Sequence, residues 1–90
     1  MGFQDIRKDI KVLGVGTAKD RALLISVWAA AKELGLPVNI VLVSSLERIL
    51  ESGVGAIPAL VIENRVVCEG RLPAVTEIID LLRQNYPLHA

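Results

Sequence analysis

One junction constrains the fold of this chain more than any other feature: an apolar run closes on glycines and a long helix follows at once. Residues 10–15 are mostly apolar or β-branched, which predicts a buried strand. From Arg21 the period becomes helical, with one apolar stripe made by Leu23, Val27, Ala30, Ala31 and Leu34. Thr17 is a suitable N-cap, and Asp20 three residues later completes a capping box. In α/β folds, such a strand-to-helix turn often carries functional groups.

The length and composition favour a single folded domain that spans residues 1–90. Of the 90 residues, 52% are hydrophobic and 22% are charged, which argues against disorder. Ten basic residues balance ten acidic ones, so no general field attracts nucleic acid. No apolar run reaches the roughly 20 residues of a membrane span. The start lacks a secretion signal, and a single cysteine suits a reducing compartment, so we expect a cytoplasmic protein.

The middle of the chain predicts a βαβ unit with short loops. Gly35 is placed to end the first helix, and residues 38–43 form a second, nearly continuous apolar strand. Ser44 and Glu47 then form a second capping box, which opens a short helix. That helix is expected to pack through Leu46, Ile49 and Leu50 and to end at Gly53.

The last third predicts a hairpin and a final helix. Residues 59–62 and 66–69 form two strands joined by a tight turn at Glu63-Asn64. Pro73 suits the first position of the last helix, whose buried stripe comprises Val75, Ile78, Ile79, Leu82 and Tyr86. With residues 1–9 as a lead-in, the order is β-α-β-α-β-β-α. It predicts a four-stranded mixed sheet with helices on both faces, and a ferredoxin-like topology is the less favoured alternative.

In this order and spacing, the sequence resembles the small thioredoxin-like proteins called redox-active disulfide proteins. The resemblance spans residues 10–82 and rests on segments 12–14, 18–19, 21–23, 32–35, 53–54, 57–62 and 70–73. It implies a thioredoxin fold in which Pro58 is a cis-proline before the third strand. In the family, the turn carries Cys-x-x-Cys, and these cysteines align with Thr17 and Asp20, in the segment Thr17-Ala18-Lys19-Asp20. Disulfide exchange needs a thiolate and a resolving thiol, so this activity is not expected here.

A binding groove at the degenerate turn is the first functional hypothesis. In thioredoxin-like proteins, the edge beside the cis-proline pairs with an extended substrate segment, which needs no cysteine. The candidate residues are Gly16, Thr17, Asp20, Ile57 and Pro58. The alternatives are that Thr17 and Asp20 only cap the helix and that Pro58 only shapes the core. No catalytic residue and no cofactor is predicted, and the partner is an unknown protein or peptide.

The second hypothesis is an enzyme related to the thiol–disulfide oxidoreductases that uses Cys68 or an external thiol. Cys68 lies in an apolar strand, where cysteine usually acts as a small hydrophobic residue. His89 is the only histidine and has no neighbouring ligand in sequence, so no metal site is predicted.

The outer face of the first helix is apolar where solvent is expected. Leu24, Ile25, Trp28 and Ala29 lie away from the stripe that meets the sheet. We expect the last helix to cover the Leu24 and Trp28 side and to leave Ile25 and Ala29 exposed. This predicts an interaction surface, most simply that of a homodimer.

Overall fold

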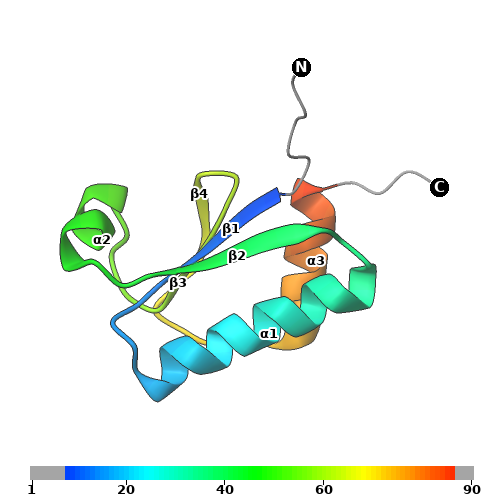
Figure 1. Cartoon of the computed structure of the whole chain (residues 1–90), viewed down its shortest axis with the longest axis horizontal. Coiled ribbons are helices and arrows are strands. Elements are labelled where there is room, and N and C mark those ends of the chain that lie inside the picture. The colour runs from blue at the N-terminus through cyan, green and yellow to red at the C-terminus, as the bar shows by residue number, and fades with distance from the viewer. Residues whose placement is uncertain (1–7, 87–90) are drawn as a thin grey trace.

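A computed structural model describes residues 8–86, and its elements follow the expected order (Figure 1). They are β1 (Lys8–Leu13), α1 (Ala18–Leu34), β2 (Val38–Val43), α2 (Leu46–Ser52), β3 (Ala59–Ile62), β4 (Arg65–Glu69) and α3 (Val75–Asn85). The predicted fold class, α/β with the order β-α-β-α-β-β-α, is therefore confirmed.

The four strands form one mixed sheet in the order β2-β1-β3-β4. β1 pairs in parallel with β2 along its whole length, from Lys8 beside Val38 to Leu13 beside Val43. β3 is antiparallel to both β1 and β4. The two inner strands are therefore β1 and β3, and β2 and β4 form the edges.

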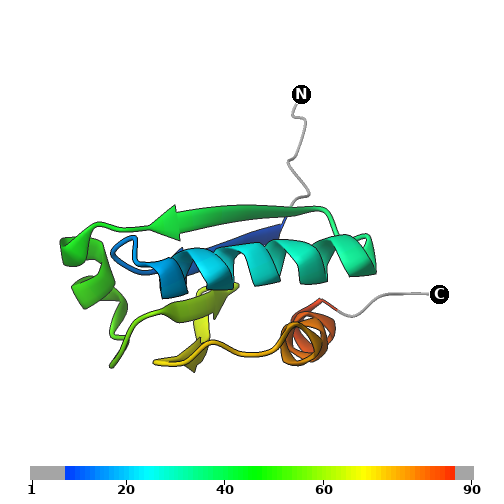
Figure 2. The same cartoon turned by 90° about the horizontal axis from the view of Figure 1, so that it is seen from below.

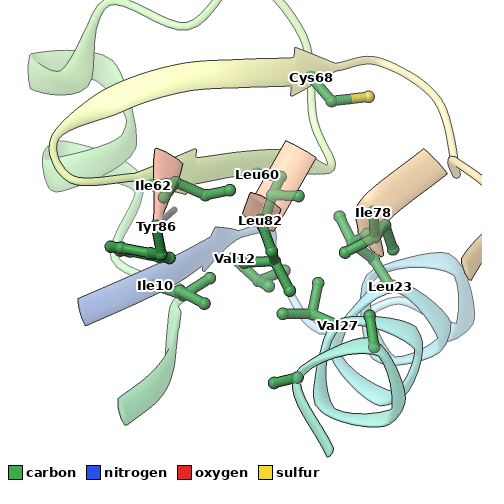
Figure 3. Close-up of a cluster of buried hydrophobic side chains, with 12 residues drawn as sticks. Ile10, Val12, Leu23, Val27, Leu60, Ile62, Cys68, Ile78, Leu82 and Tyr86 are labelled. Carbon is green, nitrogen blue, oxygen red and sulfur yellow. The ribbon is translucent and has the colours of Figure 1, made fainter. Parts of the chain in front are cut away.

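Helices cover both faces of the sheet, as predicted. α1 and α3 lie side by side over one face, whereas α2 lies on the other side at one end of the sheet (Figures 1 and 2). The larger core fills the space between the sheet and the two helices α1 and α3 with apolar side chains from both layers (Figure 3). A smaller cluster under α2 comprises Leu13, Ile49, Ala59 and Val61.

The first strand is displaced from its predicted position by two residues. It begins at Lys8, so the last two residues of the predicted lead-in 1–9 belong to it, and residues 1–7 lie outside the described residues. It ends at Leu13 because the chain turns at Gly14, whose N–H still donates to the carbonyl of Val43 at 3.1 Å. Val15, predicted to be buried, is 52% exposed.

The short helix α2 is the element that the sequence described least well. Its N-cap is Ser45 rather than Ser44, with the Ser45 hydroxyl accepting from the Arg48 N–H at 3.4 Å. Only Ile49 is buried, and the prediction that Leu46 and Leu50 pack inward is wrong. A helix of seven residues at the end of a sheet has room to bury only one narrow face.

The last helix begins later than predicted. Its N-cap is Ala74, so Pro73 stands before the helix instead of at its first position. Val75 is exposed, whereas Ile78, Leu82 and Tyr86 are buried as the stripe indicates.

Among residues 8–86, no helix combines the length and apolar character that a membrane crossing requires.

Candidate functional site at the start of the first helix

The turn between β1 and α1 is held by a reciprocal capping box. Thr17 has extended backbone angles, and its Oγ1 accepts from the Asp20 N–H at 3.2 Å. Asp20 Oδ2 accepts in return from the N–H groups of Thr17 and Gly16, both at 2.9 Å. The predicted N-cap and capping box are therefore confirmed. They satisfy N–H groups that the first helical turn would otherwise leave without partners.

Asp20 is buried, and a glycine makes room for it. Its side chain is 1% exposed, and among residues 8–86 it is the one charged residue in the core. A Cβ placed on Gly14 would lie 2.3 Å from Asp20 Cγ, far closer than atoms approach. Gly14 is therefore required at the end of β1 because the carboxylate occupies the space that any other side chain would fill.

The carboxylate of Asp20 is held in its charged form. Burial raises the pKa of Asp20, but hydrogen bonds from Thr17, Gly16 and Val15 outweigh it and hold the pKa below its ordinary value. The carboxylate also lies at the positive end of the α1 dipole. The protein's own anion therefore occupies the place where a helix N-terminus would otherwise attract an external one.

The segment around Pro58 lies beside this turn. The Ile57–Pro58 peptide bond is cis, as the resemblance implies. Because Leu13 pairs with Ala59, the chain leaving β1 and the chain entering β3 meet at the same end of the sheet. The groove residues were predicted at this end of the sheet.

Two hydrogen bonds fix this segment on either side of Ile57. The Gly55 N–H donates to Glu69 Oε1 at 2.6 Å, and the Gly70 N–H donates to the Pro58 carbonyl at 2.9 Å. Among residues 8–86, neither the N–H nor the carbonyl of Ile57 has a hydrogen-bond partner. Ile57 is also 37% exposed, so this residue reaches the surface beside the cis-proline.

The roles of Glu69 and Gly70 were not found from the sequence. Gly70 adopts a φ of +76°, and a Cβ on it would lie 3.1 Å from the Cβ of Ala56. The glycine therefore lets the loop after β4 pack closely on the segment before Pro58. Gly55 and Glu69 lie 14 positions apart and Pro58 and Gly70 lie 12 apart, so no local sequence pattern indicated these two bonds.

Cys68 has the properties of a core residue. It is 7% exposed and lies at the margin of the larger core, on β4 (Figure 3). Burial raises the pKa of its thiol, and the positive charge of Arg71 offsets this only in part. The reactive thiolate form is thus disfavoured at neutral pH.

Metal ligands do not gather in the part of the chain described. Residues 8–86 bring no three His, Cys, Asp or Glu side chains together in a way that could hold an ion. His89 lies outside these residues.

The apolar outer residues of α1 border a hollow on the β2 side of the helix. Leu24, Ile25 and Trp28 line this space of about 270 Å³ together with Ile40 of β2. Ile25 is 66% exposed and Trp28 is 58% exposed, so the prediction that the last helix covers Trp28 is wrong. Ala29 is exposed as expected but does not line the hollow. Leu24, Ile25 and Trp28 therefore lie beside the edge strand β2.

Comparison of the sequence with known protein families identifies the family of this chain. Residues 8–83 match the profile of the thioredoxin domain. The chain belongs to the thioredoxin family. It is 30% identical to a thioredoxin of Methanothermobacter thermautotrophicus over 73 residues, which cover 81% of this chain and 95% of that protein. It is 32% identical to a thioredoxin of Methanocaldococcus jannaschii over 74 residues, which cover 82% of this chain and 85% of that protein.

The cysteine content of this thioredoxin-family chain excludes a dithiol pair within it. Its 90 residues contain one cysteine, Cys68, and therefore no Cys-x-x-Cys pair. The turn at the start of α1 holds a threonine and a buried aspartate.

Proposed function

We propose that this chain is a redox-inactive member of the small redox-active disulfide proteins, in which Thr17 and Asp20 replace the two reactive cysteines. Its function is to bind an extended segment of a partner protein beside Ile57 and Pro58. The thioredoxin fold supplies the surface, and the chemistry of the turn is replaced by a capping box.

The observation that carries this proposal is that Ile57 is an exposed residue inside a fixed segment, and that its N–H and carbonyl have no hydrogen-bond partner among residues 8–86. The bonds made by Gly55 and Gly70 hold the chain on either side, so little ordering remains for a ligand to impose. The N–H and carbonyl of Ile57 are a donor and an acceptor that an extended peptide can pair with, as in strand addition. Such recognition reads the main chain and requires no thiol.

Thr17 provides a second polar contact at the same place. It is exposed, and its hydroxyl oxygen already accepts from Asp20. Its hydroxyl proton is donated to no group among residues 8–86, so it is available to a carbonyl of a bound peptide. Asp20 acts through Thr17: it fixes the turn and does not itself face the ligand.

The competing hypothesis is an enzyme that uses Cys68 or an external thiol, and the geometry gives it little support. Cys68 is buried and belongs to the core under α1 and α3, and burial raises the pKa of its thiol. Thr17 and Asp20 cannot form or resolve a disulfide.

A peptide selection followed by NMR tests the proposal. Random 12-residue peptides displayed on phage are selected on the immobilised protein, and the selected peptides are titrated into ¹⁵N-labelled protein. We expect shifts at the amides of Gly16, Thr17 and Ile57. Methylation of alternate peptide nitrogens should abolish binding with a period of two, because main-chain pairing uses every second residue.

A matched pair of variants locates the binding. Ile57→Glu should weaken binding about tenfold or more, which corresponds to about 1.4 kcal/mol. Val66→Glu is the control, because Val66 is 38% exposed and Ile57 is 37% exposed, but Val66 lies on β4 near the hairpin turn. The proposal is wrong if no selected peptide binds below about 1 mM, or if the shifts avoid the Thr17 and Ile57 neighbourhood.

A further inference from the structure

The two edges of the sheet differ in how they are protected. β4 carries Arg65 and Glu69 at its ends, and its pairing with β3 has an irregularity between Leu60 and Val61. Charges and irregular pairing are the usual devices that keep an edge from joining another strand. β2 has neither: its six residues, Val38–Val43, include no charge and no proline, and they pair with β1 in unbroken register.

The outer side of β2 has no strand beside it among residues 8–86. Alternate residues of a strand direct their N–H and carbonyl groups to each side, so this edge presents a row of backbone donors and acceptors. At about 3.3 Å per residue, six residues offer an edge of about 20 Å. An uncharged, regular edge of this length is a template for another strand.

An apolar hollow adjoins this edge on the face that carries α1. It is the space lined by Leu24, Ile25, Trp28 and Ile40, and Ile40 belongs to the edge strand itself. Lys32 places its Nζ 5.1 Å from the centre of the Trp28 ring, yet the tryptophan remains more than half exposed. The edge and the hollow therefore form one continuous corner of the molecule.

We propose that this corner binds a second copy of the chain, with the two β2 strands pairing antiparallel across a two-fold axis. An axis perpendicular to the sheet reverses the strand direction and keeps both α1 helices on the same face. α1 contacts both β1 and β2, so in such a pair the α1 helices of the two copies would lie on the same face, on either side of the paired β2 strands.

The adjoining edge and hollow identify the occupant. In this arrangement the hollows of the two copies face each other across the paired strands, so Ile25 and Trp28 of each copy lie on the side of α1 that faces the axis. A lone extended peptide would satisfy the β2 edge but leave the hollow open to water. A second copy offers a strand edge and an apolar helix flank in the same relative arrangement. Since β2 contains no ionisable residue, the paired strands oppose no like charges.

Sedimentation velocity measures the association, with a matched pair of variants on the two sheet edges. Val41 lies on β2 and Val66 on β4, their exposures are 43% and 38%, and both line the same hollow on the sheet face opposite α1. The mass obtained from sedimentation of the wild-type protein should be twice the 9.7 kDa of one chain. Val41→Lys should raise the dissociation constant about tenfold or more, because the axis brings two new charges together. Val66→Lys should leave it unchanged.

A second variant and an optical signal test the α1 half of the corner. Ile25→Glu places a charge in the hollow and should weaken the dimer to a similar degree. Trp28 is the single tryptophan, so its emission should shift to shorter wavelength as the dimer forms on raising the concentration. Circular dichroism confirms that each variant is folded.

The outcomes separate cleanly. A wild-type chain that stays monomeric at about 1 mM overturns the proposal, as does a dimer that Val66→Lys weakens as much as Val41→Lys. A peptide bound along β2 by a monomeric chain would also refute it and identify a different occupant. The result does not depend on the proposed peptide groove, because that site lies at Ile57 and Thr17 and neither residue lines this corner.

Discussion

Replacement of Asp20 by asparagine isolates the contribution of its charge to the fold. The amide keeps the shape of the side chain but loses the negative charge that two backbone N–H groups contact at 2.9 Å. A hydrogen bond to a charged group contributes about 1.5–3 kcal/mol, against about 0.5–1.5 kcal/mol for a neutral pair. The loss is therefore about 1 kcal/mol per bond, and Asp20→Asn should lower the free energy of unfolding by about 2 kcal/mol at pH 7.

The pH dependence of this difference gives a second, independent check. The folded pKa of Asp20 lies below its unfolded value of about 3.9, so the charge stabilises the fold above that pH. Its contribution is lost as the pH falls through the folded pKa. The stability gap between wild type and Asp20→Asn should thus be constant near neutral pH and narrow as the pH falls below about 4.

Urea denaturation followed by far-ultraviolet circular dichroism, at several pH values from 7 to 3, measures both quantities. The reasoning is refuted if Asp20→Asn is as stable as wild type at pH 7, or if the gap stays constant down to pH 3. A more stable variant would indicate that the carboxylate is kept for a ligand at the expense of the fold.

Three other predictions follow from buried groups. Gly14→Ala should destabilise the fold by about 3 kcal/mol or more in the same denaturation assay, because its Cβ would displace the Asp20 carboxylate; an unchanged midpoint would contradict this. Cys68 should react with a thiol-specific reagent such as Ellman's reagent much more slowly in the native protein than in urea, and equal rates would show an accessible thiol. Tyr86 is the single tyrosine, and burial raises its pKa to about 12. Its phenolate absorbance should therefore appear above pH 11, and the stability due to its neutral form should be lost as the pH rises toward 12; titration near pH 10 would refute its burial.

The sequence predicted best those features that are local in the chain. Thr17 and Asp20 are three residues apart, and the capping box depends only on helix geometry, so it was found without knowledge of the fold. Gly35 and the turn at Asn64 were located for the same reason, since glycine and asparagine tolerate the left-handed backbone angles that both adopt. Glu63 also has a positive φ, of 51°, which its residue type does not predict. The periodicity of α1 likewise indicated its core stripe.

Features that depend on long-range pairing were missed or misplaced. The bonds from Gly55 to Glu69 and from Gly70 to Pro58 join segments that only the sheet brings together. The helical wheel showed that Trp28 lies off the core stripe, but not whether β2 or α3 stands on that side. The wheel gives the direction in which each side chain leaves the helix axis. The order of the strands in the sheet decides which element lies in that direction.

The most direct test of the account is the catalysed reduction of insulin disulfides with dithiothreitol as the donor. We predict that the wild-type chain reacts at the uncatalysed rate, because Thr17 and Asp20 provide no thiol and Cys68 is buried. Thr17→Cys combined with Asp20→Cys should give a rate above background, since it restores a thiol pair at the start of α1. A wild-type rate well above background that Cys68→Ser abolishes would contradict the account and establish Cys68 as a catalytic thiol.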